Sequence, residues 1–222
     1  MIDIYLICIE LLICMTIIPI IYKKYQTEGL YIYSIVAFIL SNVMSLKIIS
    51  LSSFELNLGI VLFTSSFIAS NIIIQKKGYE EIKKLVLFIV VSSIVSFGCL
   101  YLTSLIDSSN INNFTNRSFD NIFDGSARIY FANIVTMLYF LILNGKLYYY
   151  LKKEKNKVWI SNLFSGIIIQ FLASCSFLII AYAIIKEPID IIKLIIIRYL
   201  VSLITVIIGT IPIYISSKFK ID

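Results

Sequence analysis

The chain has 222 residues, of which 59% are apolar and 14% are charged, and its formal net charge is +6 at pH 7. Soluble domains contain about 45–50% apolar and about 25% charged residues, so this chain carries more apolar surface than one water-soluble core of this size can bury. These values exclude a disordered chain, a nucleic-acid-binding module and a secreted disulfide scaffold. They predict an integral membrane protein whose main partner is the lipid bilayer.

Seven apolar runs are long enough to cross a bilayer as helices, which takes about 17–25 residues. In chain order they are residues 4–22, 30–51, 58–74, 85–106, 129–151, 158–185 and 191–217. The second and third runs are separated only by residues 52–57, where Glu55 is the single charge, so the count is six to seven. The sequence therefore predicts an all-α, polytopic bundle that forms one transmembrane domain over residues 1–222.

The basic residues indicate how this bundle is oriented. With seven spans, the loops after spans 1, 3 and 5 and the C-terminal tail share one side and hold 12 of the 19 Lys and Arg residues. The opposite loops hold Arg117, Lys186 and Lys193. Because cytoplasmic loops carry an excess of Lys and Arg, we expect the N-terminus outside and the C-terminus in the cytoplasm.

Two opposite charges are expected inside the membrane at similar depth. Glu10 lies about 9 Å inside the outer end of the first span, and Arg198 about 10 Å inside that of the last, at 1.5 Å per residue. Charges at this depth are costly alone, so the matched depth predicts an ion pair. In the functional interpretation, the Glu10 carboxylate couples or gates transport. The alternatives are a purely structural ion pair, or two side chains that each extend outward to place their charge at the membrane surface.

Amide side chains occur in four different spans, and each offers both a donor and an acceptor to a purine-like edge. We expect them to share one polar cavity, the alternative being separate hydrogen bonds between helices. Arg128, at the outer rim of the fifth span, either attracts a ligand or anchors the helix end. The candidate substrate-binding residues are Asn42, Asn71, Arg128, Asn144, Asn162, Ser165 and Gln170.

The sequence offers little for catalysis. It has no histidine, and its four cysteines lie within apolar runs without a CxxC pair. We see no nucleophile–base pair, metal-ligand cluster or P-loop. The chain is therefore predicted not to be an enzyme and to use no cofactor and no metal. Energy for transport would come from a gradient, a partner or facilitated diffusion.

Several short segments, in order and without gaps inside each block, resemble a known family. They are Ser41-Asn42, Phe67 to Asn71 with Gly78, Ala127-Arg128-Ile129, Trp159 with Ser165, Phe177 and Ile180-Ala181, and Tyr199 with Pro212 and Tyr214. With these segments the chain resembles the vitamin uptake transporter (VUT) family, usually called queuosine precursor transporters. The resemblance covers residues 37–217, and residues 1–28 form an extra N-terminal span outside it.

The resemblance implies a multi-pass protein of the bacterial cell membrane that imports 7-deazaguanine bases, the precursors of queuosine in tRNA. Family members typically carry Asp where this chain has Asn71, Asn144 and Ala173, and commonly Lys where it has Ser202. The lost charges leave an alternative, a membrane-embedded binding or accessory subunit of a larger uptake complex that no longer transports. The coupling ion and the oligomeric state, homo-oligomers included, are left open.

Overall fold

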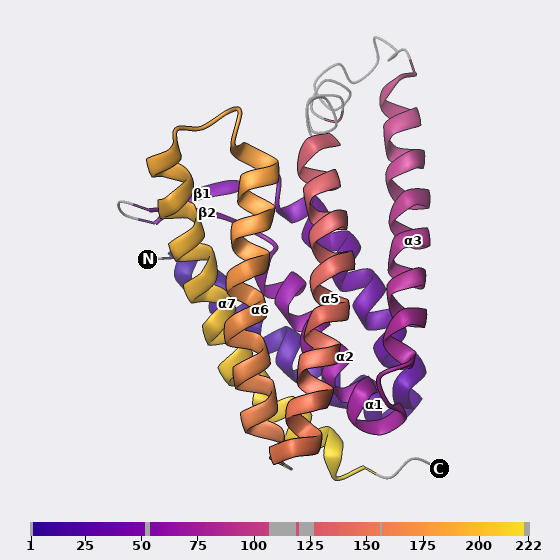
Figure 1. Cartoon of the computed structure of the whole chain (residues 1–222). Helices are drawn as coiled ribbons and strands as arrows, with labels where there is room; N and C mark the ends of the chain where they lie inside the picture. Colours follow the sequence, from indigo (N-terminus) through magenta and orange to yellow (C-terminus); the bar gives the residue numbers. More distant parts are fainter. Residues whose placement is uncertain (1, 52–53, 107–118, 120–126, 156, 220–222) are drawn as a thin grey trace.

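The computed structural model describes residues 2–51, 54–106, 119, 127–155 and 157–219 as a bundle of long helices (Figure 1). Arg117 lies outside these residues. The elements are α1 (Ile2–Met44), β1 (Ile48–Leu51), β2 (Phe54–Asn57), α2 (Ile60–Lys77), α3 (Glu81–Ser104), α5 (Ala127–Lys155), α6 (Val158–Tyr182) and α7 (Pro188–Ser217). The buried apolar residues extend from Leu11 in α1 to Ile213 in α7 and form one main core.

The first two predicted spans are both helical and form the two arms of α1. The arms meet at Gln26, whose φ of 50° and ψ of −139° interrupt the helix. A positive φ is uncommon for a residue with a side chain, so this position fixes a change of direction. The turn is tight, because a Cβ on Gly29 would lie 2.4 Å from Ile21 Cγ2.

Five helices of the described chain are long and apolar enough to cross a membrane: α1, α3, α5, α6 and α7. The remaining helix, α2, is buried along nearly all of its length from Ile60 to Ile74. Thr, Ser and Asn side chains interrupt its apolar residues, Lys76 and Lys77 end it, and the surrounding helices cover it. The fold is thus a membrane helical bundle, whereas the count of seven spans remains a prediction.

The boundary between the second and third predicted spans was wrong. Instead of continuing to residue 51, α1 ends at Met44, and the chain then forms an antiparallel hairpin in which Ile48 pairs with Asn57 and Ser50 with Glu55. The β-branched residues of β1 favour an extended strand. Gly59 then begins α2 at φ 90°, where a Cβ would lie 2.4 Å from Ser41 O. Only glycine fits such a turn without strain.

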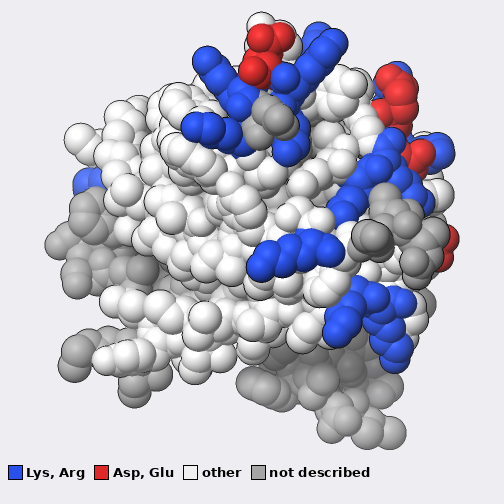
Figure 2. Space-filling model, turned by 90° about the horizontal axis from the view of Figure 1, so that it is seen from below, with Lys and Arg blue, Asp and Glu red and all other residues white. Residues whose placement is uncertain are grey.

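The segments rich in lysine gather at one end of the bundle, shown from below in Figure 2. Lys23 Nζ lies 5.8 Å from the ring centroid of Phe219, next to the end of α7. Lys76 lies over the ring of Tyr22 and donates to Phe219 O at 2.5 Å. Tyr79, between α2 and α3, contacts Tyr149 near the end of α5. The lysine-rich segments thus share one end of the bundle, and that this end faces the cytoplasm stays a prediction.

Candidate functional site

Three buried amides form a continuous chain of hydrogen bonds between helices, which we call the amide relay. Asn144 Nδ2 of α5 donates to Asn71 Oδ1 of α2 at 2.9 Å, and Asn71 Nδ2 donates to Asn162 Oδ1 of α6 at 3.0 Å. Asn162 Nδ2 then donates to Val206 O and to Thr210 Oγ1 of α7. The relay therefore joins four helices through neutral amides, of which Asn71 and Asn162 each use both a donor and an acceptor.

Close packing of the backbone brings the helices of the relay together. A Cβ on Gly166 of α6 would lie 2.4 Å from Val206 Cγ1, and one on Gly209 of α7 would lie 2.1 Å from Ile68 Cδ1. Small residues at helix contacts let neighbouring backbones approach in a membrane. Ser165, one residue before Gly166, donates to Asn162 O within the same helix, 3.3 Å away.

The other two expected amides lie outside the relay. Gln170 Oε1 is 3.5 Å from Thr64 Oγ1 of α2, and it is eight residues, or about 12 Å of helix, from Asn162. Asn42 Nδ2 donates to Phe38 O of its own helix. The expectation that four amides share one site therefore holds only for Asn71 and Asn144. The position of a residue along its helix does not determine which face of the helix it occupies.

The predicted ion pair between Glu10 and Arg198 is not formed. Arg198 Nη1 donates instead to Asn57 Oδ1 at 2.8 Å, at the end of β2. Glu10 Oε1 has no hydrogen-bond partner within the described chain. The hairpin was not expected from the sequence, and neither was a partner for Arg198 from residues 48–57.

Aromatic rings surround the Arg198 guanidinium, which is fully buried. Its central carbon lies 4.1 Å from the ring centroid of Phe177 in α6 and 5.6 Å from that of Phe63 in α2. Such contacts stabilise a cation through the negative face of the ring. The ring of Phe177 also packs edge-on against Tyr182, with the centroids 6.4 Å apart. We call Asn57, Phe63, Phe177, Tyr182 and Arg198 the Arg198 cluster.

Arg128 is engaged in a contact between helix ends. Its Nε donates to Ile180 O in the last turn of α6 at 2.7 Å. A basic side chain near a helix C-terminus satisfies a carbonyl that has no partner inside the helix. This geometry matches the anchoring role rather than the ligand-attracting one.

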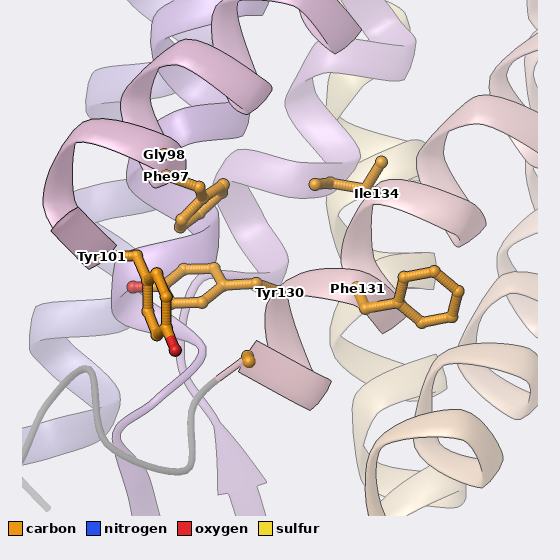
Figure 3. Close-up of a pocket in the computed structure, with 7 residues that line it drawn as sticks. Phe97, Gly98, Tyr101, Tyr130, Phe131 and Ile134 are labelled. Carbon is orange, nitrogen blue, oxygen red and sulfur yellow. The ribbon is translucent and has the colours of Figure 1, made fainter.

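A cavity of about 310 Å³ lies apart from these polar groups, between α3 and α5. Figure 3 shows the rings of Phe97, Tyr101 and Tyr130 gathered on one side, while the ring of Phe131 points away from them. The walls of the cavity are almost entirely apolar, and none of the relay amides lines it. The cavity therefore lacks the polar groups that would fix the orientation of a heterocyclic ligand.

The polar groups are arranged in layers along the contact between α2, α6 and α7, which we call the polar seam. Thr64 and Asn71 are seven residues, or two helical turns, apart on α2, and Asn57 lies seven residues before Thr64 at the end of β2. Asn57, Thr64 and Asn71 contact Arg198, Gln170 and Asn162 respectively. Asn57, Thr64, Thr210 and Tyr182 were not among the residues expected from the sequence; the interval of seven residues between Thr64 and Asn71 was a signal that could have identified Thr64.

A family model described as "Putative vitamin uptake transporter" matches residues 57–216, which begin at Asn57 and leave out α1 and β1. The match includes every residue of the relay and of the Arg198 cluster. No curated protein and no solved structure matched the chain.

Proposed function

Because the chain belongs to the vitamin uptake transporter family, we propose that it imports a small planar solute across the bacterial cell membrane, and that this solute is a 7-deazaguanine base used as a queuosine precursor. The family and the apolar helices establish a multi-pass membrane protein of a transporter family. The choice of substrate is the proposal. It follows from the resemblance of the sequence and from the chemistry of the relay.

The amide relay is the observation that carries this proposal. Asn71 and Asn144 stand where members of the family typically carry Asp, and here they bond to each other without charge. A base presents donors and acceptors along one edge, so it can replace the hydrogen bonds that the amides now make with each other. A neutral relay favours a neutral base because no carboxylate is present in it to pair with a cation.

The polar seam supports movement of a solute along the bundle. Its three layers extend from the hairpin, near the end where α6 and α7 are joined (Figure 1), toward the middle of the bundle. Polar residues in a membrane protein usually face the interior or a pathway, because lipid cannot satisfy their hydrogen bonds. Successive layers would let a base exchange one set of partners for the next.

Complementation tests the proposal. The chain is expressed in a bacterium that can neither make nor import queuosine precursors, and queuosine in tRNA is measured at low external precursor. We expect the wild type to restore the modification and Asn71→Leu to fail. The matched control is Asn42→Leu, which changes an amide at membrane depth that bonds only to its own helix. Equal modification with and without the wild-type chain would refute import of these precursors.

One observation favours the second candidate, a non-transporting accessory subunit. The hydrogen bonds of Asn71, Asn144 and Asn162 are satisfied by one another and by α7, as in a purely structural contact. The purified chain in liposomes separates the two functions. Uptake of precursor by the chain alone supports the transporter, whereas uptake only after addition of a copurifying membrane protein supports the subunit.

A further inference from the structure

The Arg198 cluster contains polar groups that are buried and only partly paired. The exposed fraction of the residue is 1% for Arg198, 0% for Asn57 and 5% for Tyr182. Arg198 Nη1 donates to Asn57 Oδ1, but Arg198 Nε, Asn57 Nδ2 and the Tyr182 hydroxyl have no hydrogen-bond partner within the described chain. A buried donor without a partner is costly, typically about 1–3 kcal/mol.

The charge of Arg198 is also uncompensated. Among the described residues no carboxylate forms an ion pair with it, since Glu55, the acidic residue of the hairpin, bonds Lys186 at 2.6 Å. The three unpaired groups, Arg198 Nε, Asn57 Nδ2 and the Tyr182 hydroxyl, can all donate a hydrogen bond. Arg198 and Asn57 are in direct contact through their own hydrogen bond. The chemistry that fits this cluster is therefore a ligand edge with acceptors.

We infer that the Arg198 cluster is a recognition subsite for an edge that presents two adjacent acceptors, the ring carbonyl oxygen and the nitrile nitrogen of the nitrile-bearing 7-deazaguanine. This inference rests on the proposed function. The guanidinium is a planar fork of N–H donors that can serve two neighbouring acceptors at once. Phe177 and Phe63 hold the guanidinium against their rings, which keeps the fork in one orientation.

The subsite lies before the relay on the polar seam. Arg198 is eight residues, or about 12 Å of helix, from Val206, where the relay ends on α7. The hairpin covers it through Asn57, and the Glu55–Lys186 ion pair fastens the hairpin to the connection between α6 and α7. A base that enters from this end meets Arg198 first and the amides second.

The same charge makes the subsite selective. The aminomethyl-bearing precursor has a cationic group in place of the nitrile, next to the ring carbonyl. Placed against Arg198, this cation meets a like charge where the dielectric constant is low, and such contacts are strongly unfavourable. The subsite thus admits the nitrile compound and rejects the aminomethyl compound.

Binding to the purified full-length chain in lipid nanodiscs tests this role without requiring transport. Each precursor is titrated by calorimetry into the wild type, Arg198→Gln, Tyr182→Phe and Lys193→Gln. We expect the wild type to prefer the nitrile compound, and Arg198→Gln to bind it roughly tenfold more weakly or worse, the usual loss for a bidentate contact. Lys193→Gln is the matched control, because it removes a cation of the same helix that pairs with Asp190 outside the cluster.

The outcomes separate the two proposals. Failure of the wild type to bind either precursor refutes the proposed function and the subsite with it. Binding of the nitrile compound by the wild type and by Arg198→Gln with equal affinity refutes the subsite alone. If Arg198→Gln does not fold, Tyr182→Phe decides, because it removes one unpaired hydroxyl and keeps the ring. Unchanged affinity in that variant overturns the inference, and a severalfold loss supports it.

Discussion

Asn144 Nδ2 of α5 donates to Asn71 Oδ1 of α2 over 2.9 Å, and both side chains are buried. Two Asp side chains at these positions, which the resemblance of the sequence implies for other members of the family, would repel each other unless a proton or a cation lay between them. The amides remove that requirement, because the donor of one meets the acceptor of the other. The hydrogen bond between Asn144 and Asn71 therefore requires neither a proton nor a bound cation between the two side chains.

This hydrogen bond should appear as a coupling energy between the two residues. In a double-mutant cycle of Asn71→Ala and Asn144→Ala we expect the losses of unfolding free energy to be non-additive by about 0.6–1.7 kcal/mol, the range found for hydrogen bonds between membrane helices. The measurement is unfolding in mixed micelles. The control cycle pairs Asn144→Ala with Gln170→Ala, which lies in another layer of the seam and should be additive. Additivity in both cycles would refute a coupled relay.

Restoring one charge should change the preferred substrate. In Asn71→Asp a carboxylate lies 2.9 Å from the Asn144 amide donor, and it can pair with the cation of the aminomethyl precursor. We expect the ratio of uptake to shift toward that compound, measured by competition between the two precursors in cells. A hydrogen-bonding site discriminates strongly against a ligand that leaves its groups unpaired. Equal shifts in Asn71→Asp and Asn42→Asp would show that the relay does not select the substrate.

Much of the fold could be predicted because apolar length is a strong signal. The first arm of α1 and the helices α2, α3, α5, α6 and α7 coincide with predicted runs within a few residues, whereas the second arm of α1 ends at Met44 instead of residue 51. The length of apolar runs could not predict the hairpin, because Ile48, Ile49 and Leu51 continue the apolar run of the preceding helix. Residues 52–53 are Ser-Ser, which is not the Asn-Gly or Asp-Gly pair that usually marks a short hairpin.

The site was predictable only as a set of polar residues at membrane depth. That Asn71 and Asn144 lie close together was expected, whereas Asn42 donates to Phe38 O of its own helix. The rotation of each helix about its axis decides these contacts, and it depends on close approaches such as Gly166 against Val206. Such approaches are long-range packing events that one sequence does not reveal.

The clustering of lysines at one end predicts how the chain is oriented. In a cysteine-free background, Ser50→Cys on the hairpin and Lys155→Cys at the end of α5 both place a thiol at an exposed position. We expect a membrane-impermeant maleimide to label Ser50→Cys in intact cells, and Lys155→Cys only after permeabilisation, because lysine-rich ends face the cytoplasm. Labelling of both in intact cells would contradict this topology.

The close approach of α6 and α7 should make Gly166 sensitive to a single methyl group. A Cβ there would lie 2.4 Å from Val206 Cγ1 and 3.2 Å from Val206 Cβ, so the stiff β-branched side chain cannot move aside without shifting α7. We expect Gly166→Ala to lower the unfolding free energy by about 1–3 kcal/mol, the usual effect of overpacking. It should also weaken uptake, because Val206 O is the acceptor that ends the relay.

Two variants make this result specific to the contact. Gly98→Ala introduces the same methyl group in α3, where no atom of the described residues lies within 4 Å, and should leave stability unchanged or improve it. Adding Val206→Ala to Gly166→Ala removes the methyl groups that the new Cβ meets, so the double variant should recover part of the lost unfolding free energy. Thermal unfolding of the four proteins in one detergent provides the comparison. If Gly166→Ala is as stable as Gly98→Ala, the helices are not held at this distance, and the hydrogen bond from Asn162 to Val206 O does not depend on their packing.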